Sequence, residues 1–260
     1  MRPERLFRAA DAPPFAATPR TDVRLAEILL YDVNDSPFCL KVRICLNVKG
    51  VPFRRVALTV GRLRELRRIN PLGKVPVLVQ DETVIPDSSR IIRHLEAEHR
   101  DPVLIPPGRE ARAYACLLEE WADEALYFIV GAFKWLNPAN RDAAIANTVN
   151  EMSGILLRPA VGRVLAWRIA RRYAAWGYGP GALEHFRERM RENLATLSTL
   201  LDGKEYLLGR VPTVADVAVF AQLAWMRRYA ERDLLDDAPV VREWLDAFAA
   251  LPPVAAALAS

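Results

Sequence analysis

The spacing of apolar residues changes once along this 260-residue chain, and the change restricts the folds that it can adopt. Between residues 28 and 99, short runs rich in Val, Leu and Ile, typical of buried strands, alternate with segments of helical spacing. Their order is strand, helix, strand, helix, strand, strand, helix, and Asp81-Glu82 joins the two adjacent strands as in an antiparallel hairpin. From Arg109 onward only the helical spacing recurs. The pattern predicts a small α/β domain followed by an all-helical domain.

The predicted domains have definite bounds. The α/β domain is expected at 28–100, a proline-rich linker at 101–108 and the helical domain at 109–260, after a loosely ordered arm at 1–27. Strands are expected at 28–33, 53–58, 75–80 and 83–85, and helices at 37–49, 60–69, 88–99, 109–136, 140–176, 181–201, 213–231 and 238–250.

Composition excludes several classes of protein. The formal net charge is +4, but acids and bases are interspersed, so nucleic-acid binding is not expected. The three cysteines (Cys39, Cys45 and Cys116) form no disulfide framework and no metal-binding spacing, which favours a reducing compartment and no bound metal. Charges interrupt every apolar run before it could span a membrane, so we expect no membrane insertion and a cytoplasmic location.

The segment SPFCLKVR at 36–43 places a hydroxyl and a thiol at the start of a helix. Ser36 suits the N-cap, and Pro37 suits the first helical position, where its missing N–H costs nothing. Unpaired backbone N–H groups and the positive end of the helix dipole favour a thiolate at such a position. The segment therefore indicates sulfur chemistry.

Two further segments describe a place for a small peptide. In NPLGKVPVLV at 70–79 the chain turns on Gly73 and enters a Val-rich strand through Val75-Pro76, which resembles a cis-proline that presents backbone groups to a peptide. In PDSSRIIRHL at 86–95, Asp87 and Ser88 open a helix whose N-terminus can hold a carboxylate.

Together, and in this order, the three segments resemble the thioredoxin-like half of the glutathione transferase superfamily, and the chain is identified as a member. The stretch GRVPTVAD at 209–216 adds a fourth similarity, because Thr213 and Asp216 have the spacing of the buried capping box in the superfamily's helical domain. The role of that box is in folding. The resemblance implies a homodimeric detoxification enzyme that transfers glutathione to a hydrophobic electrophile, with the electrophile bound between the two domains.

The resemblance also assigns roles to individual residues. Ser36 aligns with the catalytic serine of serine-type transferases, whose hydroxyl donates to the glutathione sulfur; it also suits a simple helix cap. Lys74 would meet the glycyl carboxylate and the Val75 backbone would pair with the cysteinyl unit. The implied glutathione-binding residues are Phe38, Lys74, Val75, Pro76, Asp87 and Ser88, of which the last two hold the γ-glutamyl end. Many relatives have Glu where this chain has Asp87, so the reach here is shorter.

Other interpretations of the same residues remain open. SPFC also resembles a glutaredoxin-type CPFC in which the first cysteine has become serine, which would make Cys39 the catalytic residue of a thiol transferase or peroxidase. A thiol at that position commonly faces the core and is then inert. SPFCLK also resembles the metaxin-like branch, whose members bind partners without catalysis. Tyr31, the residue type that activates sulfur in some transferases, falls inside a strand, where packing is the favoured role.

Two stretches of the helical domain bear on ligand binding. Trp121, Tyr127, Phe128 and Trp135 suit an aromatic wall of the electrophile site, although their helical spacing favours a place in the core. The Arg-rich stretch 158–172 suits contact with anionic ligands or a membrane surface, although a solvated helix face is favoured. The residues do not choose among conjugation, dehalogenation, ether cleavage, isomerisation and hydroperoxide reduction.

Overall fold

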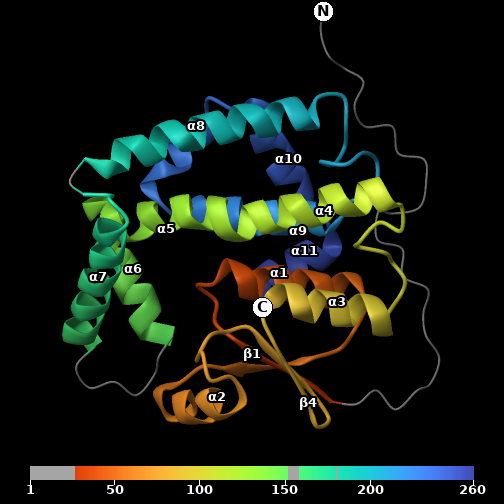
Figure 1. Cartoon of the computed structure of the whole chain (residues 1–260), viewed down its shortest axis with the longest axis horizontal. Helices are drawn as coiled ribbons and strands as arrows, with labels where there is room; N and C mark the ends of the chain where they lie inside the picture. The colour runs from red at the N-terminus through yellow and green to blue at the C-terminus, as the bar shows by residue number, and fades with distance from the viewer. Residues whose placement is uncertain (1–26, 152–157, 180) are drawn as a thin grey trace, which may run out of the picture.

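A computed structural model describes residues 27–151, 158–179 and 181–260 (Figure 1). The arm predicted at 1–27 therefore lies, apart from Glu27, outside the described residues. The same holds for 152–157, in the middle of the helix predicted at 140–176. Of the helices in the described ranges, none is long and apolar enough to cross a membrane.

The N-terminal part contains a four-stranded mixed sheet with the order β2-β1-β3-β4. Its strands are β1 (Ile28–Asp32), β2 (Arg54–Ala57), β3 (Val77–Gln80) and β4 (Thr83–Pro86). The strands β1 and β2 are parallel, whereas β3 is antiparallel to both β1 and β4. A parallel pair needs a crossover, which here contains the first helix, and an antiparallel pair can be joined by a tight turn.

Helices cover both faces of this sheet (Figure 1). They are α1 (Pro37–Val48), a 3₁₀ turn η1 (Val60–Arg62) followed by α2 (Leu63–Ile69), and α3 (Ser88–Glu98). Side chains alternate along β1, so Leu30 lies in the main core with α1 and α3, and Tyr31 packs with Leu66 of α2 on the other face. The predicted thioredoxin-like fold is confirmed.

The Tyr31 side chain packs between the sheet and α2. Its hydroxyl donates a hydrogen bond to Glu65 of α2. Burial, together with the hydrogen bond and the charge of Glu65, raises the pKa of Tyr31 to about 12. The ring therefore joins the sheet to α2 and carries a neutral phenol.

The C-terminal part is helical, as predicted. Its elements are α4 (Arg109–Trp121), a π-helical turn η2 (Ala122–Leu126), α5 (Tyr127–Leu136), α6 (Pro138–Glu151), α7 (Arg158–Ala175), α8 (Ala182–Leu201), α9 (Val214–Met226), a 3₁₀ segment η3 (Ala230–Leu235), α10 (Pro239–Ala249) and α11 (Pro252–Ala259). Nearly every residue of α9 is buried, and α11 packs back against α1. The helices α6 and α7 form a pair at one end of the rod made by α4, η2 and α5 (Figure 1).

The predicted capping box is present at the start of α9. One oxygen of Asp216 accepts from the backbone N–H of Thr213 at 2.8 Å and from the Thr213 hydroxyl at 3.0 Å. The other oxygen accepts from the N–H of Leu207 at 2.8 Å. Asp216 is fully buried, and burial raises its pKa to about 6 against the opposing effect of these hydrogen bonds.

Candidate functional site

Sheet register brings the three N-terminal motifs to one edge of the sheet. Tyr31 at the end of β1 pairs with Val77 at the start of β3, and Val77 pairs with Pro86 at the end of β4. The chain that leaves β1 towards Ser36, the chain that enters β3 through Pro76, and the chain that leaves β4 towards Asp87 therefore meet at this edge. Segments far apart in the sequence thus form one site.

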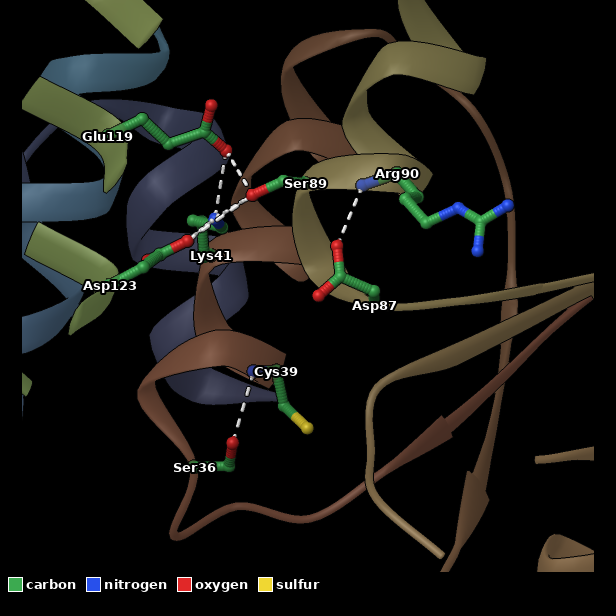
Figure 2. A network of polar contacts seen from close by, with 8 residues as sticks. All are labelled: Ser36, Cys39, Lys41, Asp87, Ser89, Arg90, Glu119 and Asp123. Carbon is green, nitrogen blue, oxygen red and sulfur yellow. Dashed lines mark hydrogen bonds and ion pairs between the residues drawn. The ribbon is translucent and has the colours of Figure 1, made fainter. Parts of the chain in front are cut away.

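Ser36 is the N-cap of α1, with extended backbone (φ −130°, ψ 119°) and Pro37 at the first helical position. Its hydroxyl oxygen accepts a hydrogen bond from the backbone N–H of Cys39 at 3.3 Å (Figure 2). A hydroxyl that accepts in this way keeps its own hydrogen for donation to another group. Because Ser36 is only half-buried, a ligand at the end of the helix can reach that hydrogen.

The thiol of Cys39 has no exposed surface. Burial, and secondarily the charge of Asp32, raise the pKa of this thiol well above its usual range. Cys45, in the next turns of α1, is also fully buried, and burial raises its pKa to about 12. Cys116 on α4 is half-buried. In this conformation Cys39 and Cys45 are neutral core thiols.

Asp87 and Ser88 open α3 beside the start of α1. The Asp87 carboxylate caps α3 by accepting from the N–H of Arg90 at 3.0 Å (Figure 2). Its φ is +81° with ψ 130°, a conformation that costs a non-glycine residue free energy. Ser88 is buried, whereas Asp87 is exposed. Strain held at an exposed carboxylate is typical of a ligand-binding position.

The segment before β3 is a shaped turn. The Asn70 side chain donates to the carbonyl of Lys74 at 2.8 Å and accepts from the N–H of Leu72 at 3.2 Å. Gly73 has a φ of +61°, and the Val75-Pro76 peptide bond is cis, as predicted. Pro76 is buried and Val75 half-buried, while the Lys74 side chain is exposed.

Asp35, the residue before Ser36, joins the start of α1 to the helical domain. The sequence did not single it out. This buried carboxylate accepts from Lys134 of α5 at 2.5 Å, from the Trp225 indole of α9 at 2.9 Å and from Arg228 at 3.1 Å. The sequence shows only an Asp in a turn next to a good N-cap, a position at which Asp is common for local reasons.

Phe38, on the other side of Ser36, also meets the helical domain. Its ring lies 4.7 Å from that of Tyr127, centroid to centroid, and Tyr127 stacks on Trp225 at 5.8 Å. Of the four aromatic residues considered for an electrophile site, Tyr127 is 38% exposed, Trp135 is buried, Phe128 packs against other rings and Trp121 is half-buried. Tyr127 therefore contacts Phe38, two residues after Ser36, directly.

A second buried network joins the first turns of α1 and α3 to the helical domain (Figure 2). The Lys41 ammonium of α1 lies 3.0 Å from Glu119 of α4, 2.5 Å from Asp123 of η2 and 3.2 Å from the Ser89 hydroxyl of α3. Ser89 donates to Glu119 at 2.7 Å. A sequence signal exists, since a charged Lys41 lies in a mostly apolar helix and must find a partner when buried.

One cation faces two carboxylates in this network. Burial raises the pKa of Asp123 to about 6 against the opposing charge of Lys41. Burial alone would lower the pKa of Lys41, but Asp123 and Glu119 raise it. Lys41 is thus a permanent cation that holds the two domains together. Within the described ranges, no group of three His, Cys, Asp or Glu side chains is arranged to hold a metal ion.

Comparison with known protein families identifies the family to which this chain belongs. The model of the glutathione S-transferase N-terminal domain matches residues 30–103, and that of the glutathione S-transferase C-terminal domain matches residues 180–247. The chain belongs to the glutathione transferase superfamily. A solved transferase family member from Pseudomonas fluorescens, with two glutathione molecules bound, shares the fold at a TM-score of 0.65 and 20% identity, over 90% of this chain and 92% of that one.

Two curated proteins are similar in sequence to this superfamily member. Glutathione S-transferase Z2 of Arabidopsis thaliana is 33% identical over 36% of this chain and 44% of its own length. FtsZ-localized protein A of Caulobacter vibrioides is 28% identical over 72% of each chain. The chain thus spans less than half of the plant relative and nearly three quarters of the bacterial one.

The residues at the sheet edge suit the tripeptide that this transferase family binds. Glutathione carries a thiol, an amide backbone and two terminal carboxylates. The edge offers a hydroxyl donor at Ser36, a strained carboxylate at Asp87 at the start of α3, and an exposed ammonium at Lys74. The helix N-termini of α1 and α3 both favour negative charge.

Proposed function

We propose that this protein is a glutathione transferase in which Ser36 activates the glutathione thiol for attack on a hydrophobic alkyl or aryl electrophile. The carrying observation is the Ser36 hydroxyl: it is half-buried at the N-terminus of α1 and keeps a hydrogen to donate. A free thiol is mostly protonated at neutral pH, and the thiolate is the nucleophile. Donation from Ser36 and the helix dipole both stabilise that thiolate.

The rest of the proposed glutathione site follows the same edge. The Val75 backbone pairs with the cysteinyl unit, while Phe38 and Pro76 shape the walls around it. Asp87 and Ser88 hold the γ-glutamyl end, and Lys74 meets the glycyl carboxylate. The geometry that supports this assignment is the sheet register, in which Val77 pairs with Pro86 and so brings the Val75-Pro76 segment next to Asp87.

We further propose a homodimer that acts in the cytoplasm in detoxification. Tyr114 and Leu117 of α4 are 52% and 66% exposed, and residues three apart lie on one face of a helix. An exposed apolar face of this kind supports burial against a second subunit.

The proposal is tested by titrating bound glutathione. Ultraviolet absorbance of the thiolate, followed against pH, should show the bound sulfur ionising about one to two pKa units below free glutathione. The Ser36→Gly variant should lose most of that shift, because it removes the hydroxyl and keeps an acceptable N-cap. A bound sulfur that keeps its proton well above neutral pH would contradict the proposal.

The second candidate is thiol transfer through Cys39. The buried, high-pKa thiol makes this reaction depend on an opening of the α1 N-terminus. Mass spectrometry after exposure to oxidised glutathione distinguishes the two: an adduct on Cys39 supports thiol transfer, and an unmodified protein that still conjugates excludes it.

The third candidate is a binding protein without catalysis. It is favoured by FtsZ-localized protein A, which is similar to this chain across both domains and whose name describes a location rather than a reaction. Calorimetry with glutathione separates this candidate from the enzymes, since heat of binding with a saturable curve supports glutathione chemistry and its absence supports the binding protein.

A further inference from the structure

The positive charge of this protein is concentrated in the α6–α7 hairpin. Residues 138–175 contain six arginines, two acids and no lysine, a surplus equal to the formal net charge of +4 of the entire chain. The remainder of the chain is therefore neutral overall. The sequence of α7 itself contains five arginines and no acid. Interspersed charges elsewhere hide this asymmetry in the overall composition.

Four arginines of α7 with described side chains have no carboxylate partner among the described residues. They are Arg163, Arg168, Arg171 and Arg172, and all four are exposed. None of the ion pairs in the described ranges involves these four guanidinium groups. Their charge is thus available to an outside anion, and it repels another copy of the same face.

Large apolar side chains share the exposed surface of α7. Val161, Val164 and Trp167 are 41%, 56% and 58% exposed, and their spacing of three places them along one side of the helix. The Arg171 guanidinium lies 4.9 Å above the Trp167 ring. A solvated helix face accounts for the arginines, but it does not account for an exposed Trp and two exposed Val in a row.

A cavity lies on this surface. It has a volume of about 560 Å³ and is lined by Leu165, Trp167, Arg168, Ile169, Arg171 and Arg172. Three arginines and one tryptophan therefore border an open hollow on the surface of α7, of a size that a small ligand or a headgroup can fill. Arg pairs with phosphate through two parallel N–H donors, which makes an anionic phosphate its natural occupant.

We propose that α7 docks this protein peripherally on membranes that contain anionic phospholipids. The guanidinium groups of Arg168, Arg171 and Arg172 bind phosphate headgroups, and Trp167 with its neighbouring Val164 enters the boundary between headgroups and acyl chains. The exposed face of α7 carries Arg, Trp and Val together, and long Arg side chains can keep their charged ends at the headgroups while the apolar side chains enter the boundary, so the helix lies on the bilayer and does not span it.

Charge and apolarity together favour a bilayer over other anionic partners. A nucleic-acid duplex would use the guanidinium groups but offers little for Val161 and Val164. A second copy related by two-fold symmetry would bring arginines against arginines. A bilayer accepts both kinds of side chain at once, since each basic residue near an anionic surface contributes favourable free energy and the apolar ones add to it.

The experiment is flotation of the full-length protein with two vesicle compositions, phosphatidylcholine alone and phosphatidylcholine mixed with phosphatidylglycerol. We expect binding to the anionic vesicles, weakened by added salt and nearly absent with the neutral ones. The double variant Arg168→Glu/Arg171→Glu should reduce the partition coefficient by at least about 10-fold. Trp167→Ala should reduce it without altering the salt dependence.

The matched control is Arg109→Glu/Arg112→Glu, two exposed arginines at the start of α4 that give the same change in net charge. It should float like the unchanged protein. The proposal is overturned if the control and the α7 variant lose binding equally, or if the unchanged protein ignores anionic vesicles. It is equally overturned if Trp167→Ala leaves vesicle binding unchanged, if the unchanged protein binds a DNA duplex more tightly than the anionic vesicles, or if the α7 variant changes the oligomeric state in gel filtration. Circular dichroism of each variant checks that the total helix content is unchanged.

Discussion

The helices α1 and α9 both begin with a hydroxyl side chain at the N-cap, and their surroundings differ in a way that separates chemistry from folding. At α9, Thr213 and Asp216 use each other and the Leu207 N–H, and all of these hydrogen bonds are buried. At α1, the Ser36 hydroxyl accepts one bond of 3.3 Å from the Cys39 N–H, lies against the Cys39 thiol and stays half-buried. The hydrogen bonds at the α9 cap are all made within the protein and stabilise the fold, whereas the Ser36 hydroxyl can donate its hydrogen to a ligand.

The strongest test of this comparison is to remove the Ser36 hydroxyl. We expect Ser36→Gly to lower the rate of conjugation by about 10- to 1000-fold, because the lost donor acts mainly on the thiolate. Unfolding free energy should fall by only a few tenths of a kcal/mol, since Gly is an acceptable N-cap. Steady-state kinetics and urea unfolding measure the two effects. Ser36→Thr, which keeps a hydroxyl, is the control; full activity in the glycine variant would move activation to another group.

For the α9 cap we expect the reverse, a loss of stability without a loss of activity. Asp216→Ala leaves the N–H groups of Leu207 and Thr213 unpaired in the core, at a cost of about 3 kcal/mol in unfolding free energy. Conjugation by the fraction that stays folded should be nearly unchanged. Chemical denaturation together with activity per folded molecule checks this, and a selective loss of turnover would mean that the α9 cap has a role beyond folding.

The pH dependence of stability sharpens the same contrast. Burial raises the pKa of Asp216 from 3.8 to about 6, so the folded state holds this proton more tightly than the unfolded state does. The associated stability is complete below pH ~4 and is lost as pH rises to ~6, by up to about 3 kcal/mol. Relative to Asp216→Asn, which does not titrate there, the unchanged protein should therefore lose stability across this window. Parallel curves would contradict the shift.

The position of the Ser36 hydroxyl should also depend on Asp35, which joins the start of α1 to the helical domain. Asp35→Asn keeps an acceptor for Trp225 but weakens the ion pairs with Lys134 and Arg228. We expect turnover to fall by about 10-fold through misplacement of Ser36, with a small change in glutathione affinity. Asp233→Asn, which breaks an exposed pair with Arg187, is the control and should leave turnover alone. An equal loss in both variants would assign the effect to general destabilisation.

The smallest effect is expected at Cys39. Cys39→Ala removes a small buried group and should cost about 1 kcal/mol in stability while conjugation changes by less than about 3-fold. Enzyme assays and thermal unfolding measure both. Loss of most activity in this variant would favour thiol transfer over activation by Ser36.

Much of the fold could be predicted because local patterns and register agree. Strand runs, the Pro37 and Gly50 signals around α1 and the capping box all follow from short-range rules. The roles of Lys41 and Asp35 could not be predicted in the same way, because their partners lie far along the chain, at Asp123 and Trp225. No spacing rule connects such positions before the domains pack together.

The sequence alone determined the order of strands and helices, the superfamily and the residues at the start of α1, since those depend on neighbours a few positions away. Tertiary structure decided that the Cys39 thiol is buried while the Ser36 hydroxyl remains accessible. It also decided that α7 leaves Trp167 uncovered. The physical reason is the same in each case, because exposure is set by which other elements pack against a side chain, and a local pattern does not specify its partners.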